Sequence, residues 1–188
     1  FTGDHVLGQG TSVFNDLGDY MRSLKKCSDL LDTEAKSSGT ADKEVLLYPA
    51  HGPTIENGKA MLKQYYAHRL ERENQVLDLL GKAPPTSGET KAWTINQITA
   101  KLYASYPEMV WPQAARGLFR HLHKLGTPDS DAQKTTGGTG QRVKCLNTSD
   151  GLAPPVPSHT DPLERWEEVL EYNWTLLDNK ATSKTGKL

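Results

Sequence analysis

The segment FTGDHVLG at residues 1–8 and the segment YPAHGP at residues 48–53 carry the clearest indication of the fold. Each has an apolar start typical of a buried strand, followed by a Gly- or Pro-rich turn that presents Asp4 or His51. Side chains at the carboxyl ends of such strands commonly line ligand sites. A carboxylate can bridge two cations, and a neutral imidazole is a good zinc ligand. The two segments therefore predict part of a binuclear metal site, with plain Gly-Asp and His-Gly-Pro turns as the commoner alternative on local evidence.

Between and beyond these turns, the spacing of apolar residues predicts two helices and one strand. Thr11 and Ser12 are the expected N-caps of the first helix, whose apolar residues run over 14–31. The second helix is expected over Asn57–Leu80, with a glycine closing it. Between the helices, Val45–Tyr48 is a continuous apolar run bounded by turn residues, which favours a buried strand.

The composition changes at residues 82–91, where prolines, serine and glycine indicate a linker. After it, one helix carrying Ile95 and Ile98, a second helix from Pro112 to Gly126 and a strand over Gln141–Leu146 make a small winged-helix pattern. A last helix is expected from Asp161, with Leu163, Trp166, Leu170, Trp174 and Leu177 on one side.

The expected domains follow from these elements. They are a first domain over 1–81, a linker over 82–91, a winged-helix-like domain over 92–147, and a segment over 148–188 with a Pro-rich stretch, the last helix and a disordered tail.

Composition sets limits on the class of protein. The chain has 188 residues, 22 Lys and Arg against 23 Asp and Glu, and a mean hydropathy of −0.63. This suits one ordinary domain or two small ones. No run approaches the ~20 apolar residues of a membrane span. The two cysteines, Cys27 and Cys145, make no disulfide framework, although one bridge stays possible. The expectation is a cytoplasmic protein without a membrane partner.

Taken in order, four segments resemble the second half of a metallo-β-lactamase superfamily hydrolase: residues 1–8, the helix around Asp16 and Tyr20, residues 48–57, and His68–Glu73. The resemblance extends to about Leu146. More narrowly, it resembles lactamase-like proteins with a C-terminal winged helix, a subgroup that includes endoribonuclease-like proteins. Within that subgroup the resemblance is closest to fungal thioesterases that release aromatic polyketides of the anthraquinone and neosartoricin type. It implies an α/β fold, with the C-terminal half of an αββα sandwich followed by a small winged-helix α+β domain.

The same resemblance implies the chemistry. Asp4 matches the carboxylate that bridges two zinc ions, and His51 matches a ligand of one of them, with Ala50 in place of the family's first glycine in that turn. Such a zinc hydrolase would cleave the thioester between a polyketide acyl chain and the acyl carrier protein of its synthase. The family's main zinc motif, His-x-His-x-Asp-His, is absent from these 188 residues. We therefore expect an N-terminally truncated fragment, and the catalytic residues stay unassigned.

Three further patterns leave alternatives open. His121 and His123 flank one leucine on a helix, where they point to different faces, and are expected on the surface. The residues from His68 to Glu73 are expected to be a solvated helix face, and His5 is expected to have a structural role. Residues 91–144 carry a net charge of +5, which suits either nucleic acid or an acidic carrier protein. An endoribonuclease and a metal-free interaction module thus remain alternatives to the thioesterase.

Overall fold

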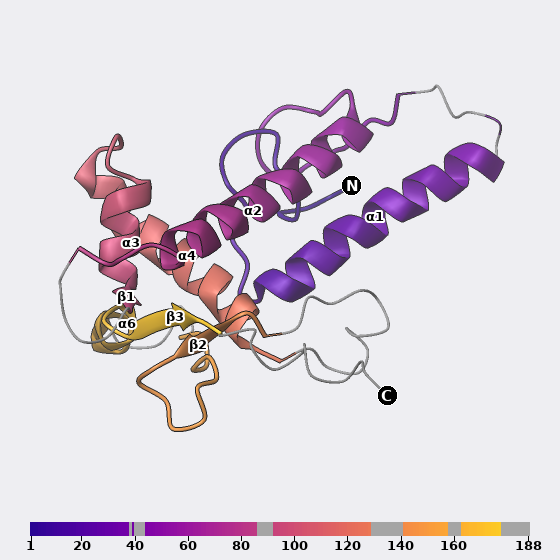
Figure 1. Cartoon of the computed structure of the whole chain (residues 1–188). Helices are drawn as coiled ribbons and strands as arrows, with labels where there is room; N and C mark the ends of the chain where they lie inside the picture. The colour runs from indigo at the N-terminus through magenta and orange to yellow at the C-terminus, as the bar shows by residue number, and fades with distance from the viewer. Residues whose placement is uncertain (38, 40–43, 86–91, 129–140, 158–162, 178–188) are drawn as a thin grey trace, which may run out of the picture. The chain divides into compact units, whose positions relative to one another are not determined.

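The computed structural model describes residues 1–37, 39, 44–85, 92–128, 141–157 and 163–177. The chain forms two compact units, residues 1–73 and 74–188, and each is described by itself (Figure 1). The boundary falls inside a long helix and before the expected linker at 82–91, of which residues 86–91 lie outside the described residues. The expected tail at 181–188 lies outside the described residues.

The first unit is built on two helices. Helix α1 spans Leu17–Ser37, and helix α2 spans Gly58–Leu80 and continues into the second unit. Asp16 caps α1, because its carboxylate accepts a hydrogen bond from the Asp19 amide at 2.7 Å. Asn57 does the same for α2 through the Ala60 amide at 3.0 Å. The unit's core consists of Val6, Leu17, Tyr20, Met21, Leu24, Leu47, Ile55 and Leu62.

The prediction of Thr11 and Ser12 as N-caps is wrong. Helix α1 begins five residues later than Ser12, whose side chain is buried and donates to the His5 carbonyl instead. Phe14 lies at helical spacing from Leu17 and Met21 but precedes the helix. Its ring stacks on that of Tyr20, with ring centroids 4.6 Å apart.

The predicted strand at Val45–Tyr48 is also wrong in this part of the chain. The segment makes isolated bridges only, antiparallel between Leu47 and Ile55 and parallel between Pro49 and Gly3. Of its apolar residues Leu47 alone is buried, while Leu46 and Tyr48 are exposed. A strand hides both faces only inside a sheet, and no such sheet covers it among the residues that the structure describes in the first unit.

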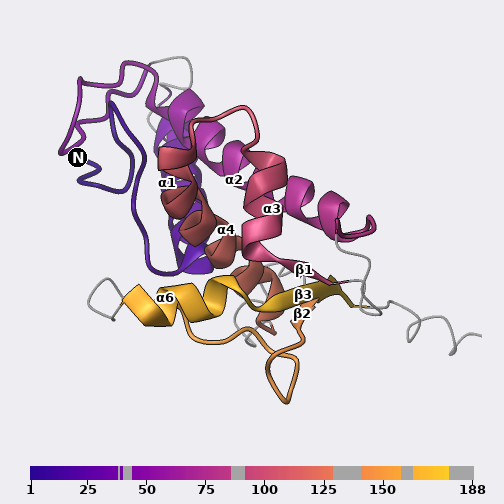
Figure 2. The ribbon, with the colours of Figure 1, turned by 90° about the vertical axis from the view of Figure 1, so that its left-hand side faces the viewer.

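The second unit has a helix-and-sheet arrangement of the winged-helix kind (Figure 2). After the last turns of α2 come β1 (Trp93–Thr94), α3 (Ile95–Leu102), the 3₁₀ turn η1 (Glu108–Val110) and α4 (Trp111–Gly126). Then follow β2 (Val143–Cys145), α6 (Leu163–Leu170) and β3 (Asn173–Leu176). The predictions for α2, α3, α4 and β2 are confirmed to within a few residues.

The sheet has the order β1-β3-β2, with both pairings antiparallel. Trp174 in the central strand lies opposite Trp93 on one side and Cys145 on the other. The prediction of one long last helix is therefore wrong beyond Leu170. The spacing of Trp166, Leu170 and Trp174 fits a helix, but the chain turns at Glu171–Tyr172 and continues as a strand.

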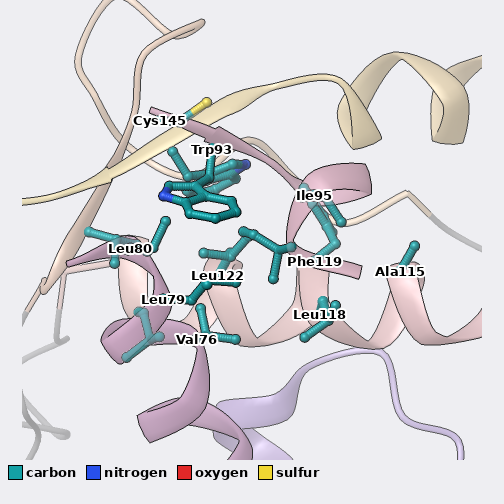
Figure 3. Packing of buried hydrophobic residues seen from close by; sticks show 14 of the residues in the cluster. Val76, Leu79, Leu80, Trp93, Ile95, Ala115, Leu118, Phe119, Leu122 and Cys145 are labelled. Atoms are coloured by element: carbon teal, nitrogen blue, oxygen red, sulfur yellow. The ribbon is translucent and has the colours of Figure 1, made fainter. Parts of the chain in front are cut away.

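The core of the second unit surrounds Trp93, Trp174 and Phe119 (Figure 3). The Phe119 ring meets the rings of Trp166 and Trp174 edge-on, at centroid distances of 6.0 and 6.2 Å. The expectation that the tryptophan stripe serves packing is confirmed. His121 is buried rather than on the surface as predicted.

Candidate metal centre

The structure brings Asp4 and His51 together. The Asp4 Oδ1 and the His51 Nε2 lie 3.4 Å apart, and both side chains are largely exposed, at 70% and 72%. Asp4 occupies the third position of a tight turn that the His5 amide closes on the Thr2 carbonyl at 3.0 Å. Gly3 takes a φ of 53° there, which costs a glycine little. The two side chains thus share one open face of the first unit.

Three backbone hydrogen bonds join the two segments that carry these residues. The Thr2 amide donates to Tyr48, the Ala50 amide to Gly3, and the Gly8 amide to His51, each at 2.9 Å. Along the chain, Asp4 follows the first two of these bonds, which involve Thr2 and Gly3, and precedes the third, which involves Gly8. The separation of the two side chains is therefore fixed by main-chain contacts on both sides of the turn.

Two glycines allow this close approach. A Cβ on Gly8 would lie 2.0 Å from the Pro53 carbonyl oxygen, and a Cβ on Gly52 would lie 2.3 Å from the Gln9 nitrogen. Gly52 also has a φ of 84°. Ala50 has no positive φ, so the turn accepts an alanine at the position where the family that the chain resembles has glycine. The loops interlock because neither glycine has a side chain.

His5 holds the far side of the turn through its main chain. Its carbonyl accepts from the Tyr20 hydroxyl at 2.8 Å and from the Ser12 hydroxyl at 3.1 Å. Burial raises the pKa of the Tyr20 phenol above its ordinary value. This hydroxyl therefore remains a donor across the physiological pH range, and α1 anchors the residue that follows Asp4.

Helix α2 supports the same loop with two side chains that the sequence did not assign. The Tyr65 hydroxyl donates to the Leu7 carbonyl at 3.1 Å and accepts from the Leu7 amide at 3.3 Å. The Arg69 guanidinium lies over the rings of Phe14 and Tyr20, 4.9 and 5.7 Å from their centroids. The prediction of a solvated face is thus wrong for Arg69, which is half-buried, and for Glu73, which is buried, whereas His68 is exposed.

Asp4 and His51 suit a divalent cation by donor type, since zinc accepts carboxylate oxygen and imidazole nitrogen. Zinc takes four ligands in structural sites and three protein ligands in catalytic ones. Within the described ranges, no group of three or more His, Cys, Asp or Glu side chains could hold a metal. The pair therefore fits as part of a zinc site, and these residues alone do not complete one.

Two arginines of α4 are partly covered by a tryptophan of α6 in the same unit. The guanidiniums of Arg116 and Arg120 on α4 lie 5.2 and 5.3 Å from the centre of the Trp166 ring on α6. Burial, then the neighbouring Arg116, lowers the pKa of Arg120. Residues 145–177 carry a net charge of −5, opposite in sign and equal in size to the charge of residues 91–144. The charge that suited nucleic acid is thus balanced inside the same unit.

Comparison with known proteins agrees with this arrangement. Residues 94–128, which include α3 and α4, match the model of the beta-lactamase associated winged helix domain. The second unit thus contains a known domain of beta-lactamase-like proteins.

Among the part of the chain that the structure describes, no helix is long and apolar enough to cross a membrane.

Individual relatives match over more of the chain. A beta-lactamase-like protein 2 homolog of Drosophila melanogaster is 34% identical over 66% of the chain and 37% of its own length. The homolog of Caenorhabditis elegans is 32% identical over 81% of the chain and 47% of its own length. The lactamase-like protein nscB of Arthroderma gypseum is 39% identical over 66% of the chain and 38% of its own length. The chain is a homologue of the beta-lactamase-like proteins, and it spans less than half the length of these relatives.

Proposed function

We propose that the whole protein is a metal-dependent hydrolase of the metallo-β-lactamase type, and that Asp4 and His51 bind its zinc. The observation that carries this proposal is the 3.4 Å approach of the Asp4 and His51 side chains on two loops joined by backbone hydrogen bonds. Zinc hydrolases of the resembling family have two metal ions, and chain outside these 188 residues would supply the other ligands.

The residues of this chain have separate tasks in such a site. The Asp4 carboxylate has two oxygens and would bridge the ions, while the His51 Nε2 would bind one of them. When bound, zinc would supply a hydroxide near neutral pH and polarise the carbonyl to be attacked. Gly8 and Gly52 hold the His51 main chain against the loop after Asp4, which keeps the two donors at a fixed separation.

We propose an acyl thioester as the substrate, presented on the acyl carrier protein of a polyketide synthase in secondary metabolism. The support is the resemblance to fungal polyketide thioesterases, together with the similarity to the fungal lactamase-like proteins. Hydrolysis of a thioester releases a thiolate, which is a good leaving group and needs no strong general acid.

The endoribonuclease alternative has less support from the second unit. Arg116 and Arg120 lie on the helix that a winged-helix protein commonly places in a nucleic-acid groove. Their guanidiniums instead lie over the Trp166 ring of α6, 5.2 and 5.3 Å from its centre. This leaves fewer of the basic groups of α4 available for phosphate contacts.

The test uses the full-length protein with Asp4→Asn and His51→Ala, and Asp29→Asn as the matched control. Asp29 is an exposed carboxylate on α1 that pairs with Lys25. Zinc content is measured by elemental analysis, and hydrolysis is followed on an acyl thioester of a carrier protein and on single-stranded RNA. We expect both site variants to lose zinc and thioester hydrolysis, and the control to keep them.

Other outcomes of this experiment decide against the proposal. Thioester hydrolysis retained by Asp4→Asn contradicts the assignment of Asp4. RNA cleavage that follows zinc content identifies an endoribonuclease. A full-length protein without zinc or hydrolysis is an interaction module.

A further inference from the structure

We infer that Arg69 is a positioning residue for the Asp4 turn, acting through Phe14, Tyr20 and the His5 main chain. The inference rests on the proposed function, because the turn matters only if Asp4 binds the metal. It gives a role to one residue of the His68–Glu73 segment, which the sequence alone left as a helix surface.

The chain of contacts is short and continuous. The Arg69 guanidinium covers the stacked rings of Phe14 and Tyr20 at 4.9 and 5.7 Å from their centroids. The Tyr20 hydroxyl donates to the His5 carbonyl at 2.8 Å. His5 follows Asp4 directly in the chain. The contacts thus lead from Arg69 on α2, through the Tyr20 ring and hydroxyl, to the residue next to Asp4.

The chemistry of arginine suits this place. A flat guanidinium stacks on aromatic rings, and the attraction of the cation to a ring face adds to the packing. A lysine keeps the charge but presents a compact ammonium in place of a plane. Arg69 fixes the tilt of the Tyr20 ring, and that tilt aims the hydroxyl at the His5 carbonyl.

Tyr65 acts on the same loop from one turn earlier on α2. Residues 65 and 69 share a helix face, and the Tyr65 hydroxyl holds both polar groups of the Leu7 main chain. Residues 4–8 have no regular helix or strand of their own in the structure. These side-chain contacts and the bonds to residues 48–53 therefore take the place of a sheet in holding the loop.

The test is amide hydrogen exchange on the full-length protein, which needs neither metal nor activity. The probes are the Gly8 and Ala50 amides, which donate to His51 and Gly3, and the amides of α1 serve as the internal reference. The variants are Arg69→Met and Arg69→Lys. Arg22→Met is the matched control, because Arg22 is an exposed arginine on α1 that pairs with Asp19.

We expect Arg69→Met to speed exchange at Gly8 by about tenfold, as the loss of a desolvated cation–aromatic contact implies, with α1 unchanged. Arg69→Lys should give a smaller increase, and Arg22→Met none. An equal increase throughout α1 and the loop, or no increase at Gly8, overturns the inference. If Arg69→Met does not fold, Arg69→Lys decides between a local and a general effect. Failure of the zinc and thioester experiment leaves this measurement unaffected, so the two proposals fail separately.

Discussion

The two units of the chain reach their ordered state by different means. Among the described residues of 74–188, seventeen buried residues form one cluster around Trp93, Trp174 and Phe119, and a three-stranded sheet runs through it. In residues 1–73, the corresponding cluster has eight buried residues, and the loops of the candidate site are joined by isolated bridges. Packing orders the second unit, whereas main-chain hydrogen bonds and two glycines order the site. A site ordered in this way leaves its side chains exposed and able to bind a ligand.

The largest effect should come from Phe119→Ala. Phe119 is fully buried between two tryptophans, and its truncation should lower the free energy of unfolding by about 3–5 kcal/mol. All four tryptophans of the chain lie in residues 74–188, so fluorescence during urea unfolding follows the second unit. Met109→Ala is the control, since Met109 is 86% exposed. An equal loss in the control would mean that packing does not set the stability of this unit.

Gly52→Ala should have the next largest effect, and should act on the first unit. The added Cβ would overlap the Gln9 main chain at a φ of 84°, at a cost of about 3 kcal/mol. Gly39→Ala isolates the backbone component, because Gly39 has a φ of 65° and nothing within 4 Å of its Cβ position. Hydrogen exchange at Gly8 measures the result. Similar losses in the two variants would contradict the interlocking of the loops.

Thr94→Ala tests the contribution of a helix cap in the packed unit. Thr94 and Gln97 form a reciprocal capping box at the start of α3, and its loss should cost about 1 kcal/mol. Urea unfolding followed by tryptophan fluorescence measures the change. Thr127→Ala is the comparison, because it removes a threonine hydroxyl that donates one hydrogen bond, to the His123 carbonyl at 2.7 Å, and forms no capping box. A loss near that of Phe119→Ala would show that local bonds matter as much as packing in this unit.

The smallest effect concerns His68, beside Arg69. Partial desolvation, then Arg69 and Arg72, lower the pKa of His68 below its ordinary value. The unfolded chain therefore binds a proton at His68 more readily than the folded chain, so this contribution to stability is present above about pH 6.5 and declines as the pH falls below it. NMR titration of the imidazole should show the lowered midpoint, and Arg69→Met should raise it, whereas Arg22→Met should not. An unchanged midpoint in Arg69→Met would show that Arg69 does not lower the pKa of His68.

The parts of the fold that could be predicted from sequence are those set by local signals. Helix α2 has an asparagine cap and twenty-three residues of helical pattern, and α4 has a proline at its start and a glycine at its end. The sequence does not indicate the start of α1, because Phe14 packs on the helix without belonging to it. It does not indicate the end of α6 either, because Trp174 pairs in the sheet with Trp93, a partner about eighty residues earlier in the chain.

The two side chains of the candidate site could be predicted from the sequence, but the residues that support their loops could not. Asp4 and His51 stand in turns whose chemistry is visible in the sequence, and the structure places them together. Arg69 follows Leu62 and Tyr65 on one helix stripe, which is a signal that it faces inward. A charged residue is nevertheless expected in solvent. The aromatic rings of Phe14 and Tyr20 that the guanidinium covers lie on a different segment of the chain, so the local sequence does not reveal this contact.

The central place of β3 has a consequence for the order of folding during synthesis. Among the described residues, strands β1 and β2 are not paired with each other, and each pairs with β3. The sheet cannot close until Trp174 has left the ribosome, so β1 must wait for about eighty further residues to be made. Contacts between such distant segments slow folding, and until then Trp93 and Cys145 lack their main partner. A nascent chain of this protein should therefore depend on chaperone protection over that interval.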